Sequence, residues 1–344
     1  MQKLFFSEFK LPSLRVDLRR VFLLTGFFVL VLFGLYLFLP AHDIQLDPNI
    51  NTNLQLPLDV ELCNSHVTTR KLYVPHRRHP HRLALLIPFR ERFTELQQFL
   101  VHLERFLNNQ NVAHTFYVLN QVDNLRFNRA ALLNVGAIES DKAETEGILV
   151  DYFSTHGEGP SWNVQRLCLP RTDYLALHDV DLLPLDPEIR YTWPSDNGIC
   201  HLIPAQLHPR YYWFKNYFGG AVLITRANFV QINGLSNSFW GWGSEDDEFR
   251  LRILRSGLNI STPSNVNSGV NAFRSIHNEA RHARDKRTYY HPEVRRLLRT
   301  LSGGLNSVNY TVDTRQLLTV SGIPVIFLNV RLQCNMSPEI CGSL

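Results

Sequence analysis

Short apolar runs alternate with segments of helical period in the middle of the chain, and this alternation limits the fold more than any other feature. The predicted elements are, in order, a strand at 83–87, a helix at 94–107, a strand at 115–120, a helix at 129–137 and a strand at 173–178. Such an order is typical of a mostly parallel sheet covered by helices. Ligands of such sheets bind at the carboxyl ends of the strands. The sequence therefore predicts an α/β fold with its site at that edge.

The remainder of the chain predicts fewer elements. They are a strand at 221–225, a helix at 249–256 and a strand at 319–332 that Pro324 interrupts. Between the second predicted helix and the third strand, residues 141–170 exceed the usual length of a connection. We interpret 141–170 as an insertion, either an extra loop or translated sequence that the mature protein lacks.

A run of nineteen uncharged, mostly apolar residues occupies positions 21–39. At about 1.5 Å per residue this run spans about 28 Å as a helix, close to the hydrocarbon core of a bilayer. The charged residues before it are mainly basic, and the positive-inside rule then predicts a cytosolic tail at 1–20 and a lumenal remainder. A cleaved signal peptide is the alternative, but 37–40 lacks a small-x-small cleavage site.

The predicted organisation is therefore a tail at 1–20, a membrane anchor at 21–39, a lumenal stem at 40–81 and a folded domain at 82–344. The stem shows no helical or strand period. Its end at 75–81 is rich in histidine and arginine, which favours a solvated basic linker over a metal site.

The net charge and the cysteines limit which partners, disulfides and metal sites are expected. A net charge of +4, without a stripe of basic and aromatic residues, argues against a nucleic-acid partner. The five cysteines leave at least one unpaired within a monomer, and Cys334 with Cys341 is the easiest pair to close. No zinc spacing is present. The sequons at Asn259, Asn309 and Asn335 are weak indications of lumenal glycosylation.

Residues 239–248 (FWGWGSEDDE) place two glycine-flanked tryptophans before four carboxylates. An acidic first turn of a surface helix would explain the charges through the helix macrodipole. A site for a sugar would explain the rings as well, because they stack on a pyranose while a carboxylate accepts a hydroxyl proton. We favour the second interpretation.

Asp179-Val180-Asp181 follows directly after the predicted strand at 173–178. Strand alternation would point both carboxylates to one side while Val180 packs behind. Two such oxygens suit Mn²⁺ or Mg²⁺ bridging a nucleotide diphosphate.

Six motifs occur together in one order: 88–92 (PFRER), 127–130 (FNRA), 178–185 (HDVDLLPL), 218–220 (FGG), 239–248 and 304–308 (GLNSV). In this set the chain resembles the β-1,4-galactosyltransferase family over most of residues 82–335. His178, the pair Glu248 and Phe249, and Leu207-His208-Pro209 favour the branch of the family whose acceptor is a β-xyloside. The GlcNAc-using branch usually differs there.

The resemblance implies a GT-A fold, Rossmann-like with a mostly parallel sheet, together with UDP-galactose as donor, Mn²⁺ as metal and inversion at the anomeric carbon. It implies Asp246 as the catalytic base and Asp181 with His277 as metal ligands, Asp179 lying outside the metal's first shell. The implied donor-binding residues are Pro88, Phe89, Arg90, Arg92, Phe127, Arg129, Val180, Asp181, Trp242 and Arg284. The implied acceptor-binding residues are Tyr211, Tyr212, Trp242, Gly243, Glu245, Asp246 and Asp247.

Two local departures from the family pattern concern these residues. Ser275 stands where the branch has the first histidine of a His-x-His metal motif, so that metal affinity is lower or His282 substitutes. The run at 211–214 (YYWF) carries one extra residue, which leaves open whether Tyr211 or Tyr212 contacts the acceptor.

The basic run at 281–287 has two interpretations, a solvated helix face or a site for the diphosphate and an anionic acceptor. Arg284 matches a family position, and we predict that it contacts phosphate.

The resulting expectation is a single-pass type II Golgi membrane enzyme that transfers galactose to xylosylated proteoglycan core proteins. A GlcNAc acceptor is the nearest alternative. A lumenal binding protein that has lost catalysis is a second, and a hydrolase using two carboxylates is a weaker third.

Overall fold

The computed structural model describes residues 81–342 apart from 146, 155–160 and 195–197. The predicted tail, the anchor at 21–39 and nearly all of the stem lie outside these residues. Among the helices of the described part, none combines the length and the apolar character needed to span a bilayer.

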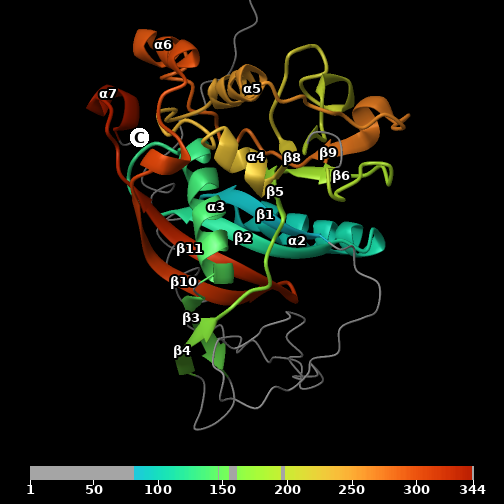
Figure 1. Cartoon of the computed structure of the whole chain (residues 1–344), viewed down its shortest axis with the longest axis vertical. Coiled ribbons are helices and arrows are strands. Elements are labelled where there is room, and N and C mark those ends of the chain that lie inside the picture. Colours follow the sequence, from blue (N-terminus) through green and yellow to red (C-terminus); the bar gives the residue numbers. More distant parts are fainter. Residues whose placement is uncertain (1–80, 146, 155–160, 195–197, 343–344) are drawn as a thin grey trace, which may run out of the picture. The chain divides into compact units, whose positions relative to one another are not determined.

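A nine-stranded sheet forms the centre of the domain, in the order β4-β3-β10-β11-β2-β1-β5-β8-β7 (Figure 1). Its strands are β1 (Arg82–Phe89), β2 (Ala113–Gln121), β3 (Ile148–Ser154), β4 (Ser161–Leu167), β5 (Tyr174–His178), β7 (Ile199–His201), β8 (Ala221–Thr225), β10 (Tyr310–Val320) and β11 (Ile323–Leu332). A second, two-stranded sheet pairs β6 (Leu182–Pro184) with β9 (Phe273–Ser275). The predicted strands of the first half are confirmed as β1, β2 and β5.

The sheet is mixed, which corrects the prediction of a mostly parallel one. Four strand pairs are parallel, and four are antiparallel. The parallel centre β2-β1-β5 arises from the alternation of strand and helix, whereas β3 with β4 and β10 with β11 are hairpins. A hairpin needs only a short turn, so it escapes a prediction based on helical crossovers.

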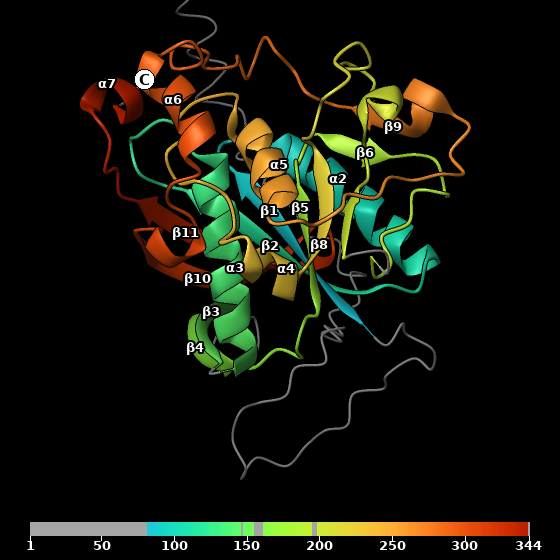
Figure 2. The same ribbon diagram turned by 45° about the horizontal axis from the view of Figure 1, so that its top comes forward.

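Helices cover both faces of this sheet (Figure 2). The described helices are α2 (Phe93–Asn109), α3 (Arg129–Thr145), α4 (Arg226–Gln231), α5 (Glu245–Arg255), α6 (Pro292–Thr300) and α7 (Pro338–Cys341). Successive residues of β1 face opposite layers. Leu85 packs in the core cluster that contains residues of α2, and Leu86 packs in the cluster that contains residues of α3. Burial on both sides explains why β1 is an uninterrupted apolar run.

The C-terminal part differs from its prediction. The predicted strand at 319–332 spans the end of β10, a turn and the whole of β11, which together form a β-hairpin that begins at Tyr310. The chain reverses at Ser321 and Gly322, both with positive φ, and Pro324 lies inside β11 opposite Thr319. Pro324 was therefore wrongly taken as the break, because the residues that allow the left-handed backbone make the turn.

The predicted insertion at 141–170 contains regular structure. It holds the end of α3 and the antiparallel strands β3 and β4, and β3 extends the main sheet by pairing in parallel with β10. In this structure the segment is therefore an edge of the sheet.

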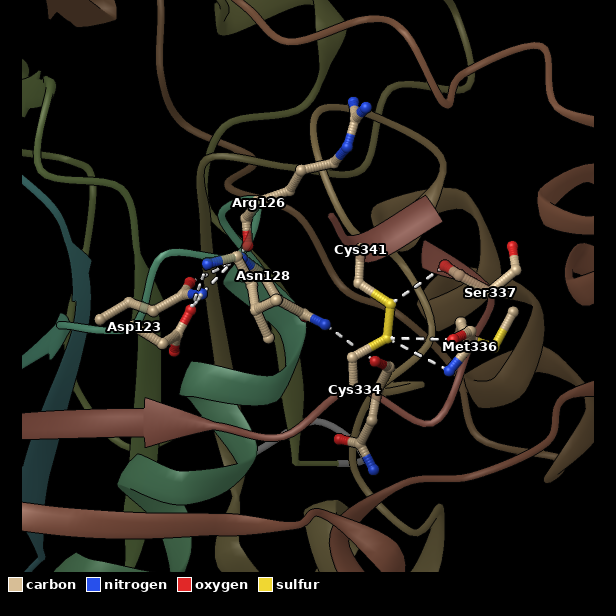
Figure 3. The surroundings of a disulfide bond; sticks show 10 residues. Asp123, Arg126, Asn128, Cys334, Met336, Ser337 and Cys341 are labelled. Atoms are coloured by element: carbon tan, nitrogen blue, oxygen red, sulfur yellow. Dashed lines mark hydrogen bonds between the residues drawn. A yellow bond between two sulfur atoms is a disulfide. The ribbon is translucent and has the colours of Figure 1, made fainter. Parts of the chain in front are cut away.

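A disulfide joins Cys334 and Cys341 and closes the loop that ends in α7 (Figure 3). The carbonyl of Cys341 accepts a 3.1 Å hydrogen bond from the backbone N–H of Arg126. The disulfide loop thereby supports the segment that leads into α3. Cys168 is also disulfide-bonded.

Candidate active site

The acidic segment forms the first turn of α5, which begins at Glu245 rather than at the predicted 249. Gly241 and Gly243 have φ values of +91° and +102°, and Ser244 has +76°. A Cβ at Gly243 would lie 2.7 Å from the ring of Tyr289. The glycines are therefore required, since the backbone is left-handed and closely packed there. The carboxylates begin a helix, as the first interpretation predicts, and that helix end faces a cavity, as a binding site would require.

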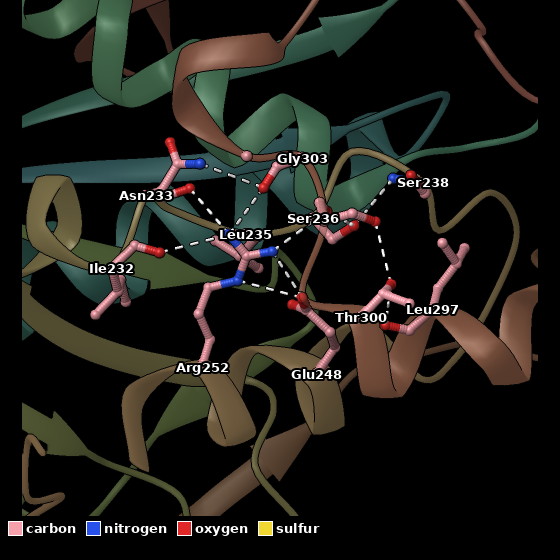
Figure 4. Close-up of polar contacts among 12 residues, drawn as sticks. Ile232, Asn233, Leu235, Ser236, Ser238, Glu248, Arg252, Leu297, Thr300 and Gly303 are labelled. Atoms are coloured by element: carbon pink, nitrogen blue, oxygen red, sulfur yellow. Dashed lines mark hydrogen bonds and ion pairs between the residues drawn. The ribbon is translucent and has the colours of Figure 1, made fainter. Parts of the chain in front are cut away.

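Glu248, the fourth carboxylate, does not line the cavity. It forms an ion pair with Arg252 on the same helix (Figure 4). Its Oε1 accepts a 2.6 Å hydrogen bond from Arg252, which also donates to the carbonyls of Asn233 and Gly303 at 3.3 and 2.9 Å. Both side chains of the pair are buried. The ion pair fixes the helix against two loops and so fixes the orientation of its first turn.

Asp179-Val180-Asp181 is a turn between β5 and β6, not a strand. The prediction that strand alternation orients both carboxylates was thus wrong, although Val180 is buried in the core as expected. Both carboxylates line the same cavity. They are held there by two different arginines.

Arg129 joins the first carboxylate to the predicted base. Its Nε donates to Asp179 at 2.6 Å, and a terminal nitrogen donates to Asp246 at 2.9 Å. Burial raises the pKa of Asp246 well above its usual value, and the charge of Arg129 acts against that rise. A carboxylate with a raised pKa, held by one cation at a helix N-terminus, suits a general base.

Arg92 and His277 flank the second carboxylate. Asp181 accepts a 2.6 Å hydrogen bond from Arg92, and the His277 Nδ1 lies 2.9 Å from the same Oδ2. Burial acts to raise the pKa of Asp181, but the His277 contact and the charge of Arg92 together hold this pKa below its usual value. Asp181 is therefore ionised and available to a cation.

The donor atoms at this point fit a metal such as Mn²⁺. Asp181 offers carboxylate oxygen and His277 offers imidazole nitrogen, both suitable for Mn²⁺. The Nε2 of His277 is buried and lacks a hydrogen-bond partner within the described part of the chain. In that same part no group of three His, Cys, Asp or Glu is placed to hold an ion, so the remaining ligands would come from substrate and water. His282 contacts Glu95 at 3.4 Å instead of joining Asp181.

A cavity of about 620 Å³ collects nearly all the predicted site residues. Those on its wall are Pro88, Arg90, Arg92, Phe127, Arg129, Val180, Asp181, Tyr211, Trp242, Gly243, Glu245, Asp246, Asp247, His277 and Arg284. Phe89 and Tyr212 do not line it.

Phe89 is a correction to the predicted donor residues. It is buried and packs edge-on against Phe327, because neighbouring residues of β1 point to opposite faces. Arg90 does line the cavity, but its guanidinium donates to the carbonyls of Asp123 and Leu125 at 3.0 and 2.8 Å. Arg90 thereby holds the loop that leads to Phe127, one of the predicted donor-binding residues.

Tyr211 lies on the cavity wall and Tyr212 does not, so Tyr211 is the better placed of the two to contact an acceptor there. His208, which the sequence singles out only as a branch marker, also has a structural role that was not predicted. Burial lowers the pKa of His208 to about 4, so the ring is neutral. Its Nδ1 accepts hydrogen bonds from the backbone N–H groups of Arg210 and Tyr211 at 2.9 and 3.0 Å. His208 thereby orients Tyr211.

A link across the cavity rim was also not predicted from the sequence. Arg126 donates to both carboxylate oxygens of Asp285 at 3.0 and 2.9 Å, and the Asp285 carbonyl accepts from the Trp242 N–H at 2.8 Å. Asp285 is an acid within the basic run 281–287, a signal that could have drawn attention. Arg284 lies over the rings of Tyr211 and Trp242, 5.7 and 5.4 Å from their centroids. The run therefore forms part of the site.

Comparisons with known proteins agree with this geometry. Residues 201–278 match the model described as the N-terminal domain of galactosyltransferase, and 42–151 match the N-terminal region of glycosyl transferase group 7. Beta-1,4-galactosyltransferase 7 of Mus musculus is 43% identical over 74% of this chain and 69% of its own length. Xylosylprotein 4-beta-galactosyltransferase of Caenorhabditis elegans is 36% identical over 83% and 88%.

Solved structures give the same result. The catalytic domain of Drosophila beta1,4galactosyltransferase 7 in complex with xylobiose has a TM-score of 0.61 and 39% identity, over 74% of this chain and 95% of that one. A mutant of the Drosophila enzyme, in complex with manganese, UDP-Gal and xylobiose, matches equally well, with a TM-score of 0.61. The fold is thus GT-A-like, with a mixed sheet. The chain belongs to the β-1,4-galactosyltransferase family of glycosyltransferases.

Proposed function

We propose that this protein transfers galactose from UDP-galactose to the 4-hydroxyl of β-xylose on proteoglycan core proteins, with Mn²⁺ as cofactor and inversion at C1. The proposal depends on one observation: a single cavity is lined by the Asp246 carboxylate, by aromatic rings such as that of Trp242, and by the Asp181/His277 pair. The relatives named for xylosylprotein acceptors and the Drosophila structure with manganese, UDP-Gal and xylobiose support the choice of substrates.

The reaction is a single displacement. Asp246 accepts the proton of the acceptor's 4-hydroxyl while that oxygen bonds to C1 of galactose and the bond from C1 to the diphosphate breaks. Arg129 holds the Asp246 carboxylate in place through its 2.9 Å hydrogen bond. Because the attacking oxygen and the leaving diphosphate lie on opposite sides of C1, the configuration inverts.

Charge on the departing UDP has to be stabilised as it develops. Asp181 and His277 would hold Mn²⁺, which when bound supplies positive charge to the diphosphate. Arg92 lies within hydrogen-bond distance of Asp181, and Arg284 lies over Trp242. Both cations therefore border the space in which the diphosphate would lie.

The test is galactose transfer by the full-length protein in detergent, with UDP-galactose, Mn²⁺ and either methyl β-xyloside or a GlcNAc acceptor. We expect Mn²⁺-dependent transfer to the xyloside that Asp246→Asn abolishes. Transfer to GlcNAc alone would move the enzyme to the other acceptor branch. Binding of UDP without transfer to either acceptor would make it a binding protein. Sugar release that needs the metal but no nucleotide would indicate a hydrolase.

For the cell, we propose a single-pass type II Golgi protein anchored by residues 21–39, with a lumenal catalytic domain at 82–344. The uncharged run, with basic residues before it, supports this orientation. The exposed sequons at Asn259, Asn309 and Asn335 offer a readout. We expect the expressed protein to be sensitive to a glycosidase. Complete digestion of the domain by a protease added to the cytosolic side of intact membranes would contradict the proposal.

A further inference from the structure

Aromatic side chains continue from the catalytic cavity to the surface along residues 211–217. Tyr217 lies nearest the predicted base, because its hydroxyl and the Asp246 carboxylate both lie beside the position that a Cβ at Gly219 would take. Tyr211 stacks on Tyr217 with ring centroids 5.1 Å apart, and Trp213 follows Tyr211 at 6.5 Å.

The outer end of this series is exposed. Trp213 is 68% exposed and Phe214 39%, their rings lie 6.0 Å apart, and both line the mouth of the same cavity. A large exposed ring that borders a binding cavity, without a packing partner that buries it, indicates a contact surface for a ligand.

The geometry of the acceptor determines what would reach this surface. Under the proposed function the 4-hydroxyl of xylose lies at Asp246, and C1 lies at the opposite end of the pyranose. The group attached to C1 would therefore extend away from Asp246. The series of rings that runs past Tyr211 offers it a path to the cavity mouth. In a core-protein acceptor that group is a serine within a polypeptide.

We propose that Trp213 and Phe214 form a binding subsite for the peptide adjacent to the xylosylated serine. This inference rests on the proposed function and adds a determinant of acceptor selectivity. The subsite acts on binding of the extended acceptor and not on the chemical step.

The experiment compares two acceptors on the full-length protein: a short glycine-flanked peptide with β-xylosylated serine, and methyl β-xyloside. The quantity measured is the ratio of kcat/KM for the peptide to that for the methyl xyloside. One aromatic contact corresponds to about 0.5–1.5 kcal/mol, so Trp213→Ala should lower this ratio by about 2- to 13-fold, mainly through KM. Trp213→Phe keeps a ring and should restore most of the ratio.

Tyr212→Ala is the matched control, because Tyr212 is 60% exposed on the same segment but does not line the cavity. We expect its ratio to equal that of the wild type. An unchanged ratio in Trp213→Ala, with both acceptors still galactosylated, would overturn the subsite. If sedimentation of that variant also changed, the rings would belong to a contact between copies. Failure of the wild type on both acceptors would overturn the proposed function, and the subsite with it.

Discussion

Asp179 and Asp181 lie two residues apart in one turn, yet they belong to two different halves of the site. Asp179 shares Arg129 with Asp246, and its pKa is raised, chiefly by burial. Asp181 contacts Arg92 and His277, and its pKa is lowered by them despite burial. The first carboxylate thus helps to position the base, while the second stays charged for a metal. We call the first group the base half of the site and the second group the metal half.

This difference shows how a short motif can couple two functions. The turn places Val180 in the core, so the backbone that carries both carboxylates cannot shift without disturbing the packing. The base half and the metal half should therefore respond separately to substitutions at the charged groups, and together to changes in the backbone beside them.

The largest effect is expected when the base half is broken alone. Asp246→Asn removes the proton acceptor and should lower kcat for galactose transfer by about 10²- to 10⁴-fold. Mn²⁺ affinity in the presence of UDP should stay at the wild-type value, because Asp246 is not among the groups around Asp181. Calorimetric titration with Mn²⁺ checks the second point, and a large loss of affinity would show that the halves are not separate.

Asp181→Asn should break the metal half. Loss of an outer-shell partner already weakens metal binding by about 10- to 100-fold, so loss of a direct ligand should raise the Mn²⁺ concentration for half-maximal activity by at least about that factor. Asp179→Asn is the matched variant in the same turn, and it should change this concentration far less. Equal effects of the two variants would argue against our division of the motif.

Gly219→Ala should disturb the base through the backbone. A Cβ at this position would collide with the Asp246 Oδ2, since Gly219 approaches that carboxylate closely. A displacement of about 1 Å can cost as much as 100-fold in rate, and we expect a decrease in kcat of about tenfold. Wild-type kcat in Gly219→Ala would place the base elsewhere.

A smaller and pH-dependent effect is expected for Arg129→Lys. The transfer rate should fall as the pH is lowered through the raised pKa of Asp246, because only the carboxylate form accepts a proton. A lysine cannot reproduce the two directed hydrogen bonds of the guanidinium, so the pKa of Asp246 should rise further. The acidic limb of kcat against pH should then move to higher pH, and a shift to lower pH would contradict the assignment.

Much of this architecture follows from the sequence because its signals are local. The apolar run of β1 and the periodic spacing of α2 predict their elements directly, and the ordered motifs predict which residues share the cavity. The hairpin of β10 and β11 was missed because Pro324 is the stronger local signal than the Ser321 and Gly322 turn.

The partners of the charged groups could not be predicted. Arg129 reaches Asp246 across 117 positions, and Arg92 reaches Asp181 across 89. Such pairs form because β1, β5 and α5 meet at the end of the sheet. The spacing of the residues along the chain does not predict that meeting. The pair Glu248 and Arg252 is different, because spacing of four on a helix suggests it.

The most direct test of the division between the two halves is anomalous diffraction at the manganese edge, from crystals of the protein with Mn²⁺ and UDP. We predict one metal peak within ligand distance of Asp181 and His277, with Arg92 moved from Asp181 and Arg129 still bound to Asp246. A metal peak between Asp179, Glu245 and Asp246 would contradict the account, because the group assigned as base would then be a metal ligand.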